Sequence, residues 1–188
     1  MDDIIDYIPV AGDIYRAAKF GWKLGSIAND LMYGHNQLLQ RAYNYLQASI
    51  KSESIRDTKR NAEYALQLLK KCDDSKKYQM AYKYTMQSQC HYLLACCNMT
   101  LDEGSVKSEF RKAIWKLREL SWIEVTWFTT NADTIRELQA EGEDYKMQII
   151  EAKREWTQQD KKRHPWKYMR WWIISVIFII FIIFFMYA

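Results

Sequence analysis

Glycine and proline are scarce in this sequence, with six Gly and two Pro among 188 residues. Along most of the chain, apolar residues recur every three or four positions, which is the period of an amphipathic helix. We therefore predict an all-α protein in which residues 35–160 form an antiparallel helical bundle. Residues 1–160 are numerous enough for one domain with a hydrophobic core of its own.

The sequence also lacks the short motifs that identify common enzyme classes. It contains no phosphate-binding glycine pattern, no zinc-binding helix motif and no nucleophile elbow. Its three histidines, His35, His91 and His164, have no motif partner. We predict that the protein is not an enzyme, and we assign it no catalytic residue, no metal ligand and no cofactor.

Residues 1–160 carry no surplus of positive charge. The whole chain has 27 Lys and Arg against 23 Asp and Glu, which gives a net charge of +4. Five of these cations lie between residues 161 and 170, and without them 22 basic residues face 23 acidic ones. Because a nucleic-acid-binding domain needs a basic face, we predict no nucleic-acid partner.

Charged side chains are absent from residues 171–188, whose sequence is WWIISVIFIIFIIFFMYA. A helix of this length spans about 27 Å, close to the roughly 30 Å hydrocarbon core of a bilayer. A buried core helix is the alternative, but seven Ile and four Phe with no polar face would leave no side for water. We predict a single transmembrane helix over residues 171–188.

The N-terminal residues include three Asp in the first six and no basic region, so no secretory signal is expected. The topology resembles that of tail-anchored membrane proteins. The resemblance covers residues 161–188 only and implies no activity.

Residues 161–170, which we call the collar, are basic and aromatic. Basic residues beside a membrane span favour the cytoplasmic side, so we expect residues 1–160 in the cytoplasm. An endoplasmic reticulum membrane is favoured, while a mitochondrial outer membrane or a bacterial inner membrane stays open. Membrane lipid is then a partner, and the predicted interface residues are Lys161, Lys162, Arg163, Trp166, Lys167, Tyr168, Arg170, Trp171, Trp172 and Tyr187.

On the cytoplasmic side the four cysteines face a reducing compartment, so disulfides are not expected. Small, inert thiols buried in the core are the default interpretation for such residues. The four are Cys72, Cys90, Cys96 and Cys97.

Capping residues and periodicity predict the limits of the helices in the bundle. Asn36 is expected to cap the first of them, and Ser105 another that follows a turn at residues 102–104. A break is expected within residues 51–58, and a long helix is expected from about Tyr78. The predicted core stripes are Leu39, Tyr43, Leu46 and Ile50; Ala62, Ala65, Leu66 and Leu69; Tyr82, Met86, Cys90, Leu93, Cys97 and Leu101; and Phe110, Ala113, Ile114, Leu117 and Leu120.

The last helix before the collar is expected to start near Asp133 and to carry an unusually regular apolar seam. Its members alternate steps of three and four residues, the period of a coiled coil. The seam either packs against the protein's own bundle or forms a homo-oligomer. It comprises Ile135, Leu138, Gly142, Tyr145, Ile149, Ala152 and Trp156.

Residues 1–34 are expected to contain a separate helix with a ridge of small residues, Ala17, Gly21 and Gly25, spaced four apart. Such a ridge lets another helix approach closely. Charged residues on the same segment argue against a membrane-spanning role, because charge near the middle of a bilayer is costly.

The chain has thirteen Tyr and eight Trp, more aromatic surface than a small bundle readily buries. Trp115, Trp122, Trp127 and Phe128 lie between two predicted helices, and aromatic residues are enriched at binding hot spots. The alternative interpretation places these rings in the protein's own core. We expect a membrane-anchored interaction or scaffold protein, or an accessory subunit of a membrane complex, that binds a protein partner at the cytoplasmic face. A second hypothesis is a membrane-remodelling or permeabilising protein that acts through an oligomerising N-terminal helix.

Overall fold

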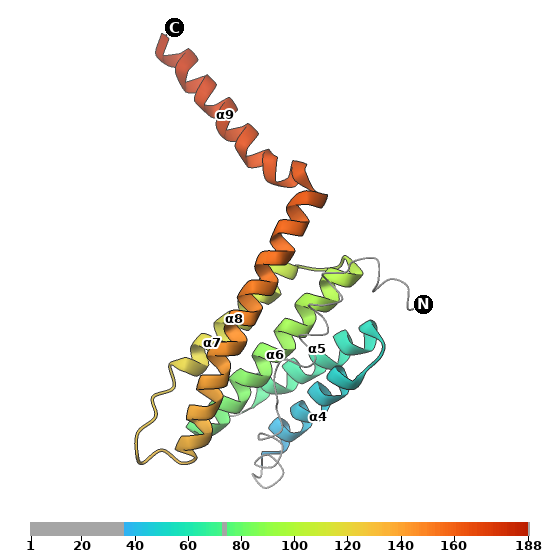
Figure 1. Cartoon of the computed structure of the whole chain (residues 1–188), viewed down its shortest axis with the longest axis vertical. Helices are drawn as coiled ribbons and strands as arrows, with labels where there is room; N and C mark the ends of the chain where they lie inside the picture. The colour runs from blue at the N-terminus through green and yellow to red at the C-terminus, as the bar shows by residue number, and fades with distance from the viewer. Residues whose placement is uncertain (1–35, 73–74, 188) are drawn as a thin grey trace. The chain divides into compact units, whose positions relative to one another are not determined.

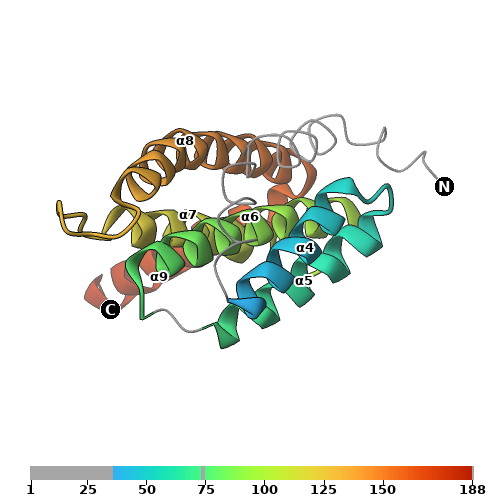
Figure 2. The same cartoon turned by 90° about the horizontal axis from the view of Figure 1, so that it is seen from below.

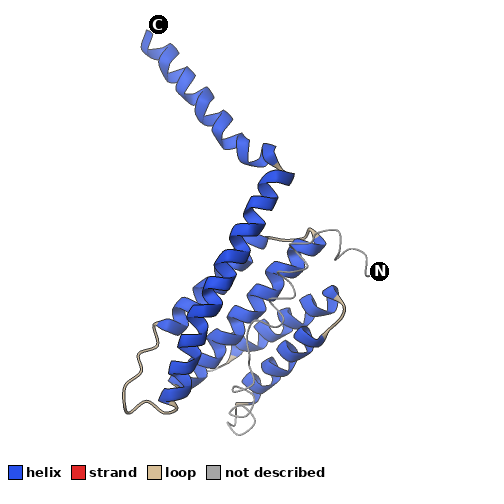
Figure 3. Ribbon diagram, in the orientation of Figure 1, coloured by secondary structure: helices blue, strands red, loops and turns tan. Residues whose placement is uncertain are grey.

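The computed structural model of the chain describes residues 36–72 and 75–187, and every regular element in these ranges is a helix (Figure 3). The side chains of residues 170–173, 181 and 184–187 lie outside the described part. The predicted ridge Ala17, Gly21 and Gly25 also lies outside it. The helices are α4 (Gln37–Lys51), α5 (Ile55–Lys71), α6 (Lys77–Leu101), α7 (Val106–Ser121), α8 (Ala132–Arg163) and α9 (Pro165–Tyr187) (Figure 1).

The chain divides into two compact units, Met1–Lys153 and Arg154–Ala188. In the first unit α6 lies between the α4–α5 hairpin and α7 (Figure 2). Short connections join α4 to α5 and α6 to α7, which is the arrangement expected for antiparallel neighbours. The all-helical bundle predicted from periodicity is confirmed.

Helix α4 begins where the sequence predicted, because the Asn36 side-chain oxygen accepts a hydrogen bond of 3.2 Å from the backbone N–H of Leu39. Its buried face differs from the predicted stripe. Leu39 and Leu46 are buried as expected, but Ala42 and Ser49 complete the face, whereas Tyr43 and Ile50 are only half-buried. Small residues let α5 approach this face, which leaves the larger side chains of Tyr43 and Ile50 at its edge.

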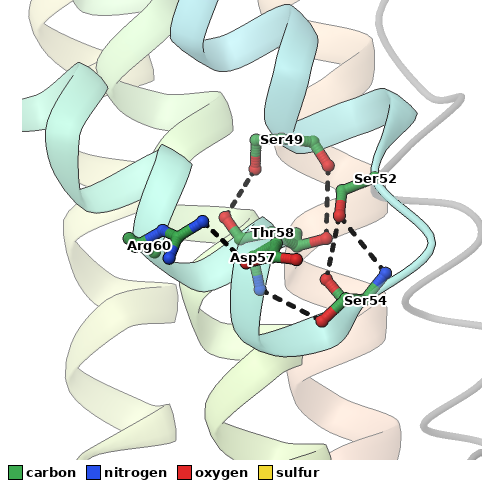
Figure 4. Close-up of polar contacts among 6 residues, drawn as sticks. All are labelled: Ser49, Ser52, Ser54, Asp57, Thr58 and Arg60. Carbon is green, nitrogen blue, oxygen red and sulfur yellow. Dashed lines mark hydrogen bonds and ion pairs between the residues drawn. The ribbon is translucent and has the colours of Figure 1, made fainter.

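Two buried residues join α4 to α5 by a reciprocal pair of hydrogen bonds (Figure 4). The Ser49 hydroxyl donates to the Thr58 carbonyl at 2.7 Å, and the Thr58 hydroxyl donates to the Ser49 carbonyl at 3.2 Å. Ser54 caps α5 by accepting from the backbone N–H of Asp57 at 3.4 Å. The break predicted within residues 51–58 is therefore confirmed and is three residues long, 52–54.

Helix α6 is buried on nearly all sides. From Thr85 to Thr100 every residue except His91 is buried, so this part of the helix has no solvent-exposed face. Such a helix is expected at the centre of a bundle, where neighbours cover it all round. Its predicted stripe is buried from Tyr82 to Cys97, and Leu101 at its end is half-buried.

All four cysteines lie among the described residues, where they are buried and form no disulfide. Burial raises the pKa of the Cys90 and Cys96 thiols, so both stay protonated at neutral pH. They pack as small apolar residues.

The turn after α6 uses backbone conformations that few residues adopt. Asp102 and Gly104 have φ angles of +52° and +64°. A β-carbon on Gly104 would lie 3.0 Å from the Asn98 side-chain nitrogen, so this position favours glycine. Ser105 then caps α7, as predicted, by accepting from the backbone N–H of Ser108 at 3.3 Å.

The seam of α8 packs against the protein's own bundle. Six of its seven predicted members are buried, and Trp156 is half-buried. Tyr145 stands at its centre, where the hydroxyl donates to Gln89 of α6 and the ring meets Tyr92 edge-on at 5.7 Å. Gln139 adds a link to the end of α7, because its amide nitrogen donates to the carbonyls of Leu120 at 3.0 Å and Ile123 at 2.9 Å.

The second unit contains the end of α8 and the whole of α9. One non-helical residue, His164, separates the two helices, and Pro165 is the first residue of α9. Proline is favoured there because its missing N–H has no helical partner at that position. Among the residues described, we find no helix with the length and apolar character that a membrane crossing requires.

Replacement of Tyr145 by Phe tests the link between α8 and α6. The change removes a donor from the buried Gln89 oxygen and leaves the ring in place, so we expect a loss of about 1–3 kcal/mol in unfolding free energy. Urea unfolding of the full chain in a fixed detergent measures it. Tyr64→Phe, at a half-exposed ring on α5, is the matched control, and equal stability of the two variants would contradict the assignment.

Candidate partner-binding surface

Two exposed tryptophans lie at the C-terminal end of α7. Trp115 is 47% exposed and Trp122, the C-cap residue, is 64% exposed. Their rings meet edge-on with centroids 5.5 Å apart. The indole N–H of Trp115 donates to Glu119 at 3.0 Å, and Lys116 pairs with the same carboxylate at 2.5 Å. We call Trp115 and Trp122 the tryptophan pair.

A second exposed pair lies in the loop between α7 and α8. Trp127 and Phe128 are 82% and 75% exposed, and their centroids are 3.5 Å apart. They occupy the middle of a turn that Thr126 and Thr129 close. The Thr129 N–H donates to the Thr126 carbonyl at 3.1 Å, and the Thr126 N–H donates to the Thr129 hydroxyl at 2.9 Å. We call residues 126–129 the aromatic turn.

The structure therefore places all four aromatic residues of the predicted partner surface on the outside. It divides them into one pair on a helix and one on a turn, and no ring contact links the two pairs in the described part of the chain. The interpretation that these rings fill the core is wrong for all four.

A cavity of about 470 Å³ opens beside the aromatic turn, where the N-terminal end of α6 meets the α7–α8 loop. Lys77 ties the two segments together, because its ammonium donates to the Glu124 carbonyl at 2.7 Å. Lys76 lies with its ammonium 5.9 Å from the ring centroid of Tyr78. The cavity is lined by Lys76, Lys77, Tyr78, Thr126, Phe128, Thr129 and Thr130.

Sequence reasoning missed Lys76, Lys77 and Tyr78 as members of this site. They lie about fifty positions before the aromatic turn, and only the fold brings the two segments together. The turn itself could have been recognised locally. Threonine flanks Trp127-Phe128 on both sides, and threonine hydroxyls often close short turns.

In the collar the described side chains are on the surface, with Trp166 74% exposed. The cations Lys161, Lys162, Arg163 and Lys167 are exposed and Tyr168 is half-buried. The side chains of Arg170, Trp171, Trp172 and Tyr187 lie outside the described part.

Asp160 joins the end of α8 to the collar, a role that the sequence did not indicate. Its carboxylate accepts hydrogen bonds from the Tyr168 hydroxyl and, at 3.1 Å, from the Lys167 ammonium. Burial acts to raise the pKa of Asp160, but the contacts with Tyr168 and Lys167 outweigh it and hold this pKa below 3.8. Burial first, and then the bond to Asp160 and its negative charge, raise the pKa of Tyr168 to about 12.

A polar cluster at the α6–α7 contact gives His91 a partner that no sequence motif indicated. Its ring nitrogen lies 2.6 Å from one Glu109 oxygen, and the Lys112 ammonium lies 2.6 Å from the other. Burial acts to raise the pKa of Glu109, but the contacts with His91 and Lys112 outweigh it and lower the pKa. Within the described ranges, no group of three or more His, Cys, Asp or Glu side chains is placed to hold a metal ion.

Comparisons with protein-family models, with curated proteins and with solved structures find no match to this chain. The features of this chain that bear on its function are therefore the tryptophan pair, the aromatic turn with its cavity, and the collar.

Replacement of Asp160 by Asn tests the contact with Tyr168. The change removes a negative charge and weakens the hydrogen bond, so the pKa of Tyr168 should fall from about 12 while staying above 10, because the burial of the ring is unchanged. Ultraviolet difference titration against the Tyr168→Phe variant isolates this one tyrosine. A Tyr168 titration that is identical with Asp or Asn at position 160 would contradict the contact.

Proposed function

We propose that this chain is a membrane-anchored interaction protein. Residues 171–188 hold the helical bundle at the cytoplasmic face of a membrane, and the tryptophan pair binds a protein partner there. In this role the protein acts as a scaffold or as an accessory subunit of a membrane complex. The observation that carries the proposal is the exposure of two tryptophans that meet edge-on, one on α7 and one at its C-cap.

The character of α9 supports an anchor. Four successive side chains, at residues 177–180, are each more than half exposed, so apolar groups face outward in all directions around the helix. Apolar surface in water costs about 25 cal/mol per Å², and hydrocarbon removes that cost. The proposed span also includes residues 171–173, 181 and 184–188, whose side chains lie outside the described part.

Orientation follows from the collar. Lys161, Lys162, Arg163 and Lys167 are exposed immediately before the apolar segment, and basic residues favour the cytoplasmic side. The same residues are available to anionic lipid headgroups. With this orientation the bundle lies in the cytoplasm, with the endoplasmic reticulum as the favoured membrane.

The geometry of the tryptophan pair supports a protein partner. Trp115 is held by Glu119 and by the edge of Trp122, so little side-chain freedom remains to be lost on binding. Large, preorganised aromatic side chains dominate the energetics of protein interfaces. The alternative of membrane remodelling rests on residues 1–34, which lie outside the described residues.

The anchor is tested by placing two charges in the middle of the apolar segment. In the Ile179→Asp/Ile180→Asp variant each carboxylate costs about 2.5–3.5 kcal/mol at the centre of a span, so insertion should fail. After alkaline carbonate extraction, we expect the natural chain in the membrane pellet and the variant in the supernatant. Ile179→Leu/Ile180→Leu is the control, and release of the natural chain would contradict the anchor.

The partner surface is tested by site-specific photo-crosslinking in native membranes. With benzoylphenylalanine at position 122 we expect an adduct of one discrete mass, and with the same probe at Tyr64, which is 45% exposed on α5, we expect none. Adding Trp115→Ala should reduce the adduct about tenfold or more, because truncation of a hot-spot residue costs about 2 kcal/mol or more. The same adducts from both positions, or no adduct from position 122, would exclude this surface.

A further inference from the structure

The aromatic turn is unusual in how much of each ring it exposes. Trp127 and Phe128 project from the centre of the turn at 82% and 75% exposure, more than either member of the tryptophan pair. The hydrogen bonds between Thr126 and Thr129 fix the backbone and hold the rings outward. This arrangement therefore keeps two large apolar groups in water, which is unfavourable unless another phase receives them.

Cations and hydroxyl groups stand directly beside these rings. Lys76, Lys77, Thr129 and Thr130 line the cavity that Phe128 also lines. The ammonium of Lys77 is fixed against the loop by its bond to the Glu124 carbonyl. Ammonium and hydroxyl groups are the donors that bind phosphate oxygens.

We propose that the aromatic turn and its cavity bind the surface of a bilayer that contains anionic lipid. Trp127 and Phe128 enter the headgroup layer, where the indole ring keeps its N–H near water. Lys76 and Lys77 contact lipid phosphates at the cavity. The strength of binding to a membrane interface increases with buried apolar area and with basic charge. This site has both, in the two aromatic rings and the two lysines.

The turn favours a lipid surface over a protein partner. Its two rings extend beyond the loop, with a lysine-lined cavity on one side, whereas the tryptophan pair lies along a helix and is held by neighbouring side chains. Of the residues in the loop 122–131, only Glu124 is acidic, and its backbone carbonyl, rather than its carboxylate, accepts from Lys77. The lining of the cavity itself contains two lysines and no acidic residue, and this positive charge complements an anionic headgroup.

This inference concerns a loop of the bundle and does not depend on residues 171–188 being an anchor. The test therefore uses the full chain held in nanodiscs of phosphatidylcholine, so that the apolar segment cannot enter a second bilayer. Co-flotation then measures binding to separate vesicles of phosphatidylcholine, with or without phosphatidylserine. Failure of the chain to enter nanodiscs would count against the anchor alone, and binding would then be measured with the free chain.

We expect the protein to bind the vesicles that contain phosphatidylserine and to bind pure phosphatidylcholine much more weakly. Lys76→Gln/Lys77→Gln should weaken binding about 25-fold, because each cation near an anionic surface contributes roughly fivefold. Trp127→Ser/Phe128→Ser should weaken it about tenfold or more. Both changes lie at exposed positions, and circular dichroism verifies that the bundle stays folded.

Matched control variants carry the same chemical changes elsewhere. Met147→Ser removes a side chain that is 61% exposed on α8, and Lys51→Gln/Arg56→Gln removes two exposed cations near the α4–α5 connection. Neither should change vesicle binding. If the natural chain ignores anionic vesicles, or if the turn and lysine variants bind as tightly as it does, the proposal is wrong. Binding only to native membranes, lost after protease treatment, would identify a protein partner and would also overturn it.

Discussion

The bundle depends on the burial of α6. A helix covered on nearly every side needs neighbours in several directions, and α4, α5, α7 and α8 supply them. Each of these neighbours needs only one apolar face, which explains why α4, α5 and α7 are amphipathic while α6 is not. The aromatic rings on α7 and in the following loop stay exposed to solvent because they lie away from the face of α7 that covers α6.

Burial on all sides also brings polar groups into the core, and two of them bond to neighbouring helices. Ser88 donates to the Ala113 carbonyl of α7 at 3.0 Å, and Gln89 accepts from Tyr145 of α8. Each bond joins two helices at one register. Because a buried polar group without a partner costs more than its bond contributes, such contacts select one packing arrangement among several that would bury similar area.

The tryptophan pair and the aromatic turn differ in the contacts that hold them in place. The tryptophan pair is part of a helix and its cap, whereas the aromatic turn is fixed by its own hydrogen bonds and by Lys77 from the start of α6. Both pairs are apolar groups that lie outside the core. In a small protein such exposure indicates contact with another phase or molecule. The proposed protein partner for the first pair and the proposed lipid surface for the second would account for the difference in their surroundings.

By itself the sequence indicated where several of the helices begin, and it shows that residues 171–188 carry no charge. Caps such as Asn36 and Ser105 act on backbone groups two or three residues away, so they can be recognised locally. Only the tertiary structure decided that the α8 seam is covered by its own bundle, that Ala42 and Ser49 replace Tyr43 and Ile50 in the core, and that Lys76 and Lys77 meet the aromatic turn. Burial and charge pairing depend on residues that are far apart in the chain. A local sequence pattern does not predict which of these residues become neighbours in the fold.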